Sequence, residues 1–289
     1  MKYHIRRSVG AIIFVIALAT AMYTQRVRIA DLAREASAPE LPEAVSYADA
    51  AQQTEKPATE SDERTIPDAP EIPEPVADVP AKTANEEPPV VLPTVSDIPA
   101  SYNLAVPFTS QAPFANWDAL HEETCEEAAA YMVAAYYLGV QGVIDSQVAE
   151  NELQRLVAIE NDLFGYYQDT TAVETAQLVA KAYGLHAQTE NDLTVEDIKN
   201  HVAAGHPVIV PTAGRLLHNP NFSGDGPPYH MIVIRGYTET QFIANDPGTR
   251  RGEGYVYDIN TVMDATHDWT GSFDTIETGP KVVVVIYPE

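Results

Sequence analysis

Hydrophobic and polar positions divide the chain into three parts. Residues 8–24 form a continuous run without charge, with basic residues before and after it. Residues 31–98 are acidic, rich in proline and low in hydrophobicity. From residue 99 onward, apolar positions recur first at helical spacing and later in short β-branched runs. The pattern therefore predicts an N-terminal apolar segment at 1–30, a linker at 31–98 and a folded domain at 99–289.

Helical spacing occupies the first half of the folded part. Thr124 and Glu127 have the spacing of a capping box, and Thr171 and Glu174 repeat it. Gly184 is a residue that commonly follows a helix end. We expect helices over residues 125–138, 146–159, 171–184 and 194–205.

The second half changes to the pattern of strands. Runs rich in Val, Ile and Tyr alternate with turn residues, and we expect strands over residues 207–211, 230–237, 241–246, 255–257 and 281–287. Helices first and strands later, with short connections, predict an α+β fold with a mainly antiparallel sheet. The chain shows no phosphate-binding glycine loop and no HExxH motif, so we expect no cofactor and no metal.

The two N-terminal segments indicate a membrane tether. The uncharged run at 8–24 is near the lower limit for a membrane-spanning helix, and it also fits a secretory signal with a cleavage site after Ala19. The linker holds eleven of the 22 prolines, and such a composition is typical of disordered chain. We expect a single-pass anchor in the membrane of a bacterial cell, with an extracytoplasmic C-terminal domain. A cleaved signal would give a secreted protein instead.

Charge and cysteine content narrow the range of partners. A formal net charge of −25 argues against nucleic acid, which requires clustered Lys and Arg. The single cysteine, Cys125, cannot form an internal disulfide. It is expected at the first position of a helix, where free N–H groups favour a thiolate. The neighbouring glutamates oppose this effect, and most lone cysteines are core residues.

A cysteine nucleophile needs a base, a group that orients the base and an oxyanion donor. His230 opens a predicted strand directly after a loop rich in Gly and Pro, so it is the best candidate for the base. Asp246 ends the next strand and could orient the imidazole, although an Asp before Pro-Gly is also ordinary turn chemistry. Asn245 is an alternative, but its side chain should point to the opposite face of the sheet. The amide of Gln111 could donate to an oxyanion.

Four short motifs carry a resemblance to a known family. They are VPFTSQAP at 106–113, CEEA at 125–128, YHMIVI at 229–234 and NDPGTR at 245–250. In this order they resemble the peptidase C39-like family, papain-fold relatives of cysteine peptidases. The resemblance covers residues 103–289 and implies Cys125 as nucleophile, His230 as base, Asp246 as orienting residue and Gln111 as oxyanion donor. Many family members have glycine where this chain has Glu126.

The expected function is therefore a membrane-tethered, extracytoplasmic cysteine peptidase with a papain-like fold. Its substrate would be a peptide or protein, with cell-wall peptide as one candidate. A peptidoglycan amidase or endopeptidase with the same residues is a second reading. A papain-like binding module at the cell surface, with an ineffective Cys125 beside Glu126, is a third.

Overall fold

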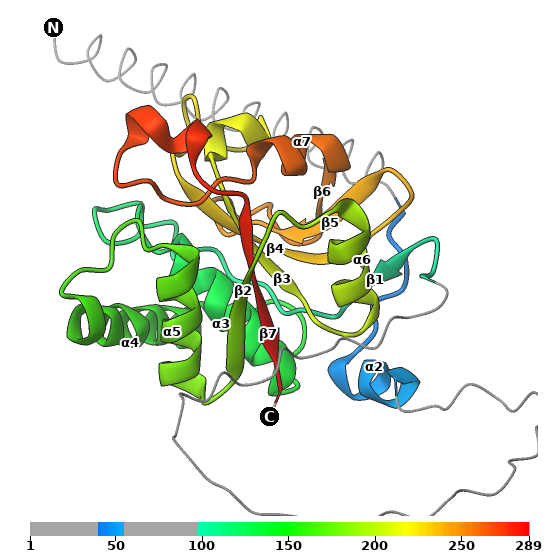
Figure 1. Cartoon of the computed structure of the whole chain (residues 1–289). Helices are drawn as coiled ribbons and strands as arrows, with labels where there is room; N and C mark the ends of the chain where they lie inside the picture. Colours follow the sequence, from blue (N-terminus) through cyan, green and yellow to red (C-terminus); the bar gives the residue numbers. More distant parts are fainter. Residues whose placement is uncertain (1–39, 55–97, 289) are drawn as a thin grey trace, which may run out of the picture. The chain divides into compact units, whose positions relative to one another are not determined.

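The computed structural model describes residues 40–54 and 98–288, and nearly all of them belong to one compact unit that begins at Pro42. The described part is built around a seven-stranded sheet with the order β2-β7-β3-β4-β5-β6, in which β1 also pairs with β4 (Figure 1). Every pairing is antiparallel. The predicted α+β class with an antiparallel sheet is confirmed.

The strands agree with the hydrophobic pattern except at Tyr102–Asn103 and His186–Asn191, two strands that the sequence did not predict. They are β1 (Tyr102–Asn103), β2 (His186–Asn191), β3 (Val208–Thr212), β4 (His230–Tyr237), β5 (Gln241–Asn245), β6 (Tyr255–Asp258) and β7 (Val282–Tyr287). β4 lies inside the sheet and all of its residues are buried. β2 was not expected from the sequence, because it is an edge strand with a mostly polar sequence that pairs only with β7 among the described strands.

The helices cover the sheet. They are α2 (Tyr47–Thr54), α3 (Cys125–Tyr137), α4 (Ser146–Phe164), α5 (Ala172–Tyr183), α6 (Val195–Ala203) and α7 (Ile259–Ala265), with 3₁₀ turns η1 (Gly214–Leu217) and η2 (Phe273–Thr278). α3 packs on β4 and α5 packs on β2 and β7, while α4 packs against both helices. α6 contacts β1, β3 and β4. Figure 1 shows α3, α4 and α5 on one side of the sheet and α6 on the other.

The caps of these helices were predicted correctly at α5 but not at α3. The Thr171 side chain accepts a hydrogen bond from the Glu174 backbone N–H, and the Glu174 carboxylate accepts one from the Thr171 backbone N–H. Thr124 forms no such cap. Its hydroxyl donates instead to the Gln111 carbonyl at 3.1 Å. The capping box expected at Thr124 was therefore wrong, because this hydroxyl ties two loops together.

α3 is enclosed on all sides. Every residue from Cys125 to Tyr136 is buried, and five of them are alanines that let neighbouring elements approach closely. Apart from Glu126 and Glu127 in its first turn, α3 presents apolar or aromatic side chains on every face, which is typical of a helix inside a core. Its first residue is Cys125, so the candidate nucleophile stands on the most deeply packed helix of the domain.

Residues 42–54, which we call the N-terminal strap, are bound to the same unit. The Val45 N–H donates to the Asn103 carbonyl at 2.8 Å, and the Ala105 N–H donates to the Val45 carbonyl at 2.7 Å. Ala50 is buried. The sequence predicted these residues to be part of the disordered linker. They are ordered instead, because Val45 and Ala50 supply apolar contacts to the domain within that acidic stretch.

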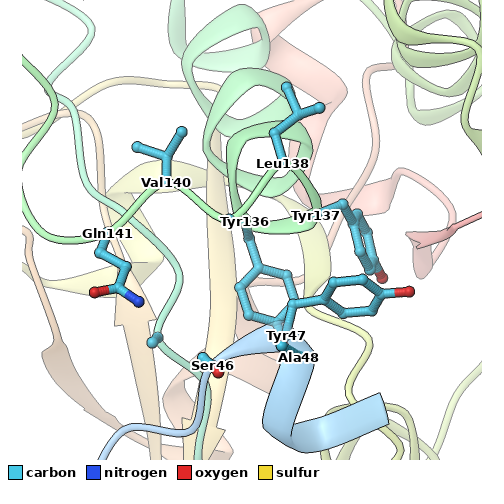
Figure 2. A pocket seen from close by; sticks show the side chains of 10 residues that line it. Ser46, Tyr47, Ala48, Tyr136, Tyr137, Leu138, Val140 and Gln141 are labelled. Carbon is cyan, nitrogen blue, oxygen red and sulfur yellow. The ribbon is translucent and has the colours of Figure 1, made fainter.

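The strap also closes the C-terminal end of α3. The Tyr47 ring packs edge-on against Tyr136 and Tyr137, at centroid distances of 5.7 and 5.0 Å. Figure 2 shows these rings beside a hollow. The hollow has a volume of about 340 Å³ and is lined by strap residues 46–48, Ala105 and residues 136–141. This hollow lies at the opposite end of α3 from Cys125, so it is separate from the candidate chemistry.

The predicted apolar segment at 1–30 and the linker residues 31–39 and 55–97 lie outside the described residues. Within the residues that are described, no helix is long and apolar enough to cross a membrane.

Candidate active site

His230 and Asp246 are joined directly, as the adjacent strands suggested. His230 is the first residue of β4, and Asp246 follows the last residue of β5. The imidazole Nε2 lies 2.8 Å from Asp246 Oδ1, and both side chains are buried. Because Nε2 is held by the carboxylate, Nδ1 is the ring nitrogen left for a reacting group.

Asp246 is held ionised by a set of donors. Its Oδ1 also accepts from the Gly248 N–H at 2.9 Å, and its Oδ2 accepts from Asn219 Nδ2 at 2.9 Å and from the Tyr257 hydroxyl at 2.5 Å. Burial acts to raise the pKa of Asp246, but the His230 charge and these hydrogen bonds outweigh it and bring the pKa below its ordinary value. A buried carboxylate of this kind can orient an imidazole and stabilise its protonated form.

The His230 ring is fixed by packing as well as by hydrogen bonding. The Phe222 ring meets it edge-on, with centroids 5.4 Å apart. Gly248 lies so close that a Cβ atom there would stand 2.8 Å from His230 Cε1 and 2.9 Å from Phe222 Cε1. Only glycine fits at this position without moving the ring.

Cys125 lies next to the same end of β4. The backbone N–H of Met231, the residue after His230, forms a hydrogen bond to the thiol. The thiol itself donates to Glu126 Oε2 at 3.0 Å. Among the described residues, no hydrogen bond joins the thiol to His230. In this structure the sulfur therefore lies beside the backbone at the start of β4, and its thiol is hydrogen-bonded to a carboxyl.

The surroundings of Cys125 favour the thiol. Burial raises its pKa well above the ordinary value, and the charge and hydrogen bond of Glu126 raise it further. The hydrogen bond from Met231 acts in the opposite direction. The advantage expected from a helix N-terminus is thus outweighed in this arrangement by burial and by the adjacent carboxyl.

Gln111 connects the loop before α3 to the loop after β5. Its backbone N–H donates to the Pro247 carbonyl at 3.0 Å. Its side-chain Nε2 donates to the carbonyls of His121 and Glu122, at 2.9 and 3.2 Å. The Gln111 amide is therefore bound to the segment that directly precedes Cys125. Both of its protons are donated to backbone carbonyls, so one of these hydrogen bonds must break before the amide can donate to an oxyanion.

Asn245, the alternative orienting residue, lies on the other face of β5. Its Nδ2 donates to the carbonyls of Val106 and Pro107, at 3.1 and 3.0 Å. The expectation that it points away from the imidazole is confirmed. It ties the segment that carries Gln111 to the sheet.

Several residues of the site were not expected from the sequence. Asn219 and Phe222 come from a loop with no regular pattern, and no signal in the sequence marks them. Tyr257 could have been found from the sequence. It alternates with Tyr255 on the strand that pairs with β5, so both side chains lie on one face of the sheet. No group of three or more His, Cys, Asp or Glu side chains is arranged to hold a metal ion in the described part of the chain.

Comparison with known proteins identifies a family of peptidases. The sequence model of the Peptidase_C39 like family matches residues 103–273, which include all four predicted site residues. No curated protein is significantly similar in sequence to the chain.

Three solved structures are similar at low sequence identity. A C39-like peptidase from Bacillus anthracis is 16% identical, with 65% of this chain and 98% of that chain covered and a TM-score of 0.42. A double glycine motif protease from an AMS/PCAT transporter, in complex with its leader peptide, is 16% identical, with coverages of 60% and 89% and a TM-score of 0.34. The peptidase domain of Streptococcus ComA is 17% identical, with coverages of 58% and 93% and a TM-score of 0.32.

Proposed function

The chain belongs to the Peptidase_C39 like family, and from this membership we propose that it is a cysteine peptidase that hydrolyses amide bonds. Cys125 is the nucleophile, His230 the base, Asp246 the orienting residue and Gln111 an oxyanion donor. The observation that supports this most strongly is the buried hydrogen bond of 2.8 Å between His230 and Asp246. It lies at the same end of β4 where the Met231 N–H reaches the Cys125 sulfur.

The reaction begins with proton transfer from sulfur to the base. The Cys125 thiol gives its proton to Nδ1 of His230, and the ionised Asp246 stabilises the imidazolium. The thiolate attacks the carbonyl carbon of the substrate amide. The developing oxyanion is held by the Cys125 backbone N–H, which has no acceptor within its helix, and by the Gln111 amide.

The second half of the reaction releases both products. The His230 imidazolium protonates the leaving amine, which breaks the C–N bond and leaves a thioester on Cys125. Water, activated by the neutral imidazole, then hydrolyses the thioester and restores the thiol. Gly248 and Phe222 contribute by keeping the ring in one position through both transfers.

The substrate is a peptide or protein outside the cytoplasm. This part of the proposal rests on the sequence, since the uncharged run at 8–24 with its basic flanks would anchor the chain in the cell membrane, or direct its secretion if cleaved. The alternative activity is that of a peptidoglycan amidase or endopeptidase, in which the same four residues would act on cell-wall peptide. The excess of negative charge disfavours nucleic acid as a partner.

A second function, that of a binding module with an ineffective cysteine, is favoured by one observation. The Cys125 thiol is engaged by Glu126 rather than by His230. A thiol that stays protonated would not attack an amide.

Turnover of a defined substrate separates these functions. The wild-type protein and Cys125→Ala are incubated with a peptide library and with purified sacculi, and products are identified by mass spectrometry. We expect cleavage by the wild type and none by Cys125→Ala, with unchanged circular dichroism. Cleavage of sacculi alone would assign the amidase, and cleavage of neither substrate would favour the binding module.

A further inference from the structure

Three glutamate side chains are buried together behind Cys125. Glu126 and Glu127 are the second and third residues of α3, and Glu160 faces them from α4. Their exposed fractions are 1%, 0% and 0%. Both carboxyl oxygens of Glu127 and the Oε2 atom of Glu160 are buried without a hydrogen-bond partner among the described residues.

The surroundings favour neutral carboxyls in this cluster. Burial raises the pKa of Glu126 and of Glu127 well above the ordinary range, and it raises the pKa of Glu160 to about 7. The charged groups that act on Glu126 add to this, because Glu160 and Asp169 are also carboxyls. Buried like charges cannot all ionise, so protons are retained inside the cluster.

We propose that Glu126 is a positioning residue for the Cys125 sulfur, and that the direction of the hydrogen bond between them decides whether the sulfur can act as a nucleophile. This inference rests on Cys125 being the nucleophile of the proposed function. The contact that carries it is the 3.0 Å distance between Sγ and Glu126 Oε2.

The two directions correspond to two protonation states. When Glu126 is ionised, it accepts the hydrogen bond of the S–H group and holds the thiol in its protonated form. When Glu126 is neutral, its O–H can donate to the sulfur after the thiol proton has moved to His230. In that step the S–H bond breaks and an N–H bond forms on the imidazole, while Glu126 keeps its own proton throughout.

The groups that act on the charge of Glu126 come from two helices and two connecting segments. They are Cys125 and Glu127 on α3, Glu160 on α4, Asp169 before α5, and Tyr229 directly before β4. The Tyr229 hydroxyl donates to the Thr170 carbonyl and to Asp268 Oδ1, at 3.0 and 2.9 Å, so its proton is already directed away from Glu126. In the proposed function His230 receives the proton of the thiol. A rise in pH therefore ionises Glu126 and weakens the nucleophile.

The test is the rate of alkylation of Cys125 by iodoacetamide between pH 5.5 and 9, in the wild type and in Glu126→Gln. Gln keeps the size of the side chain and can donate to the sulfur, but it cannot ionise. We expect similar rates at pH 5.5 and about tenfold faster alkylation of the variant at pH 9. Loss of an adjacent negative charge can lower a thiol pKa by about two units, which increases the fraction of thiolate about a hundredfold. The thiolate of lower pKa is about tenfold less nucleophilic, so the net increase in the alkylation rate is about tenfold.

Glu127→Gln is the matched control, since it removes a carboxyl of the same cluster that has no hydrogen bond to sulfur. The proposal would be overturned if the ratio of the alkylation rates of Glu126→Gln and wild type did not change with pH. It would also be overturned if Glu127→Gln changed the alkylation rate as much as Glu126→Gln does. The readout needs no substrate. If the protein cleaves no peptide, the result therefore counts against the proposed function alone. If it cleaves peptide but wild type and Glu126→Gln show the same pH dependence of alkylation, the result counts against this inference alone.

A measurement on the wild type covers the case in which Glu126→Gln does not fold. Infrared spectra near neutral pH are compared before and after the Cys125 sulfur is blocked with methyl methanethiosulfonate. Because the blocked sulfur loses its hydrogen bond, we expect the carbonyl band of a protonated carboxyl to shift. An unchanged band would contradict the proposed contact.

Discussion

Replacing Glu160 by Gln should stabilise the protein in a strongly pH-dependent manner. The Glu160 side chain is fully buried against Glu127, and burial raises its pKa from 4.5 to about 7. A carboxyl with a raised pKa binds its proton more tightly in the folded state. Its favourable contribution is therefore complete below about pH 4.5 and is lost as the pH rises through about 7.

The size of this effect follows from the pKa. At about 1.4 kcal/mol for each pKa unit, the rise to about 7 corresponds to about 3 kcal/mol of unfolding free energy lost between acid and alkaline pH. Gln is neutral at every pH and can still accept from the Thr170 hydroxyl, which lies 3.2 Å from Glu160 Oε1. Glu160→Gln should thus match the wild type near pH 4.5 and exceed it by about 3 kcal/mol near pH 8.5.

Urea unfolding followed by circular dichroism at several pH values measures this difference. The difference between variant and wild type is needed, because burial lowers the pKa of His206 to about 4 and so makes total stability fall toward acid pH. Asp162→Asn on the exposed side of α4 is the control and should show no such trend. A Glu160→Gln difference that is the same at pH 4.5 and 8.5 would refute the reasoning.

Three further predictions concern the site and the strap. Gly248→Ala places a methyl group 2.8 Å from His230 Cε1, so turnover should fall about a hundredfold while the melting temperature changes little; unchanged turnover would contradict the close packing. Asp246→Asn removes the charge that stabilises the imidazolium, so turnover should fall by about 10⁴ in steady-state assays, and a loss below tenfold would exclude an orienting role. Tyr47→Ala removes two aromatic contacts, one of them with Tyr136, and should cost about 2 kcal/mol in urea unfolding with normal turnover; an unaltered midpoint would show that the strap adds no stability.

The sequence predicts most of the fold because its apolar pattern is strong where burial is deep. β4 and β7 are β-branched runs inside the sheet, and α5 carries a complete capping box at Thr171. β2 was missed because an edge strand needs little apolar surface. The order of β4 and β5 was sufficient to place His230 beside Asp246, since a short hairpin brings the two positions to one end of the sheet.

The sequence could not predict the contacts to the site that come from irregular loops and from distant segments. Asn219 reaches Asp246 from an irregular loop, and no periodicity specifies such a contact. The capping box expected at Thr124 failed because local spacing does not reveal that Gln111, from a distant segment, supplies an acceptor. The contact between Cys125 and Glu126 is local, yet its importance depends on Glu160, which only the tertiary structure brings close.

The N-terminal strap has a consequence for how the chain responds to proteolysis. Residues 42–54 are held to the domain by a β-bridge at Val45 and by the rings around Tyr47, while residues 55–97 join them covalently to the rest. A protease that cuts between 55 and 97 would leave two pieces joined by non-covalent contacts alone, which also include the hydrogen bond from Asn103 Nδ2 to the Pro42 carbonyl. Anything attached to the chain before residue 42 would then remain on the domain after the cut. Release would follow only when the strap dissociates, so the cut would convert a permanent connection into a reversible one.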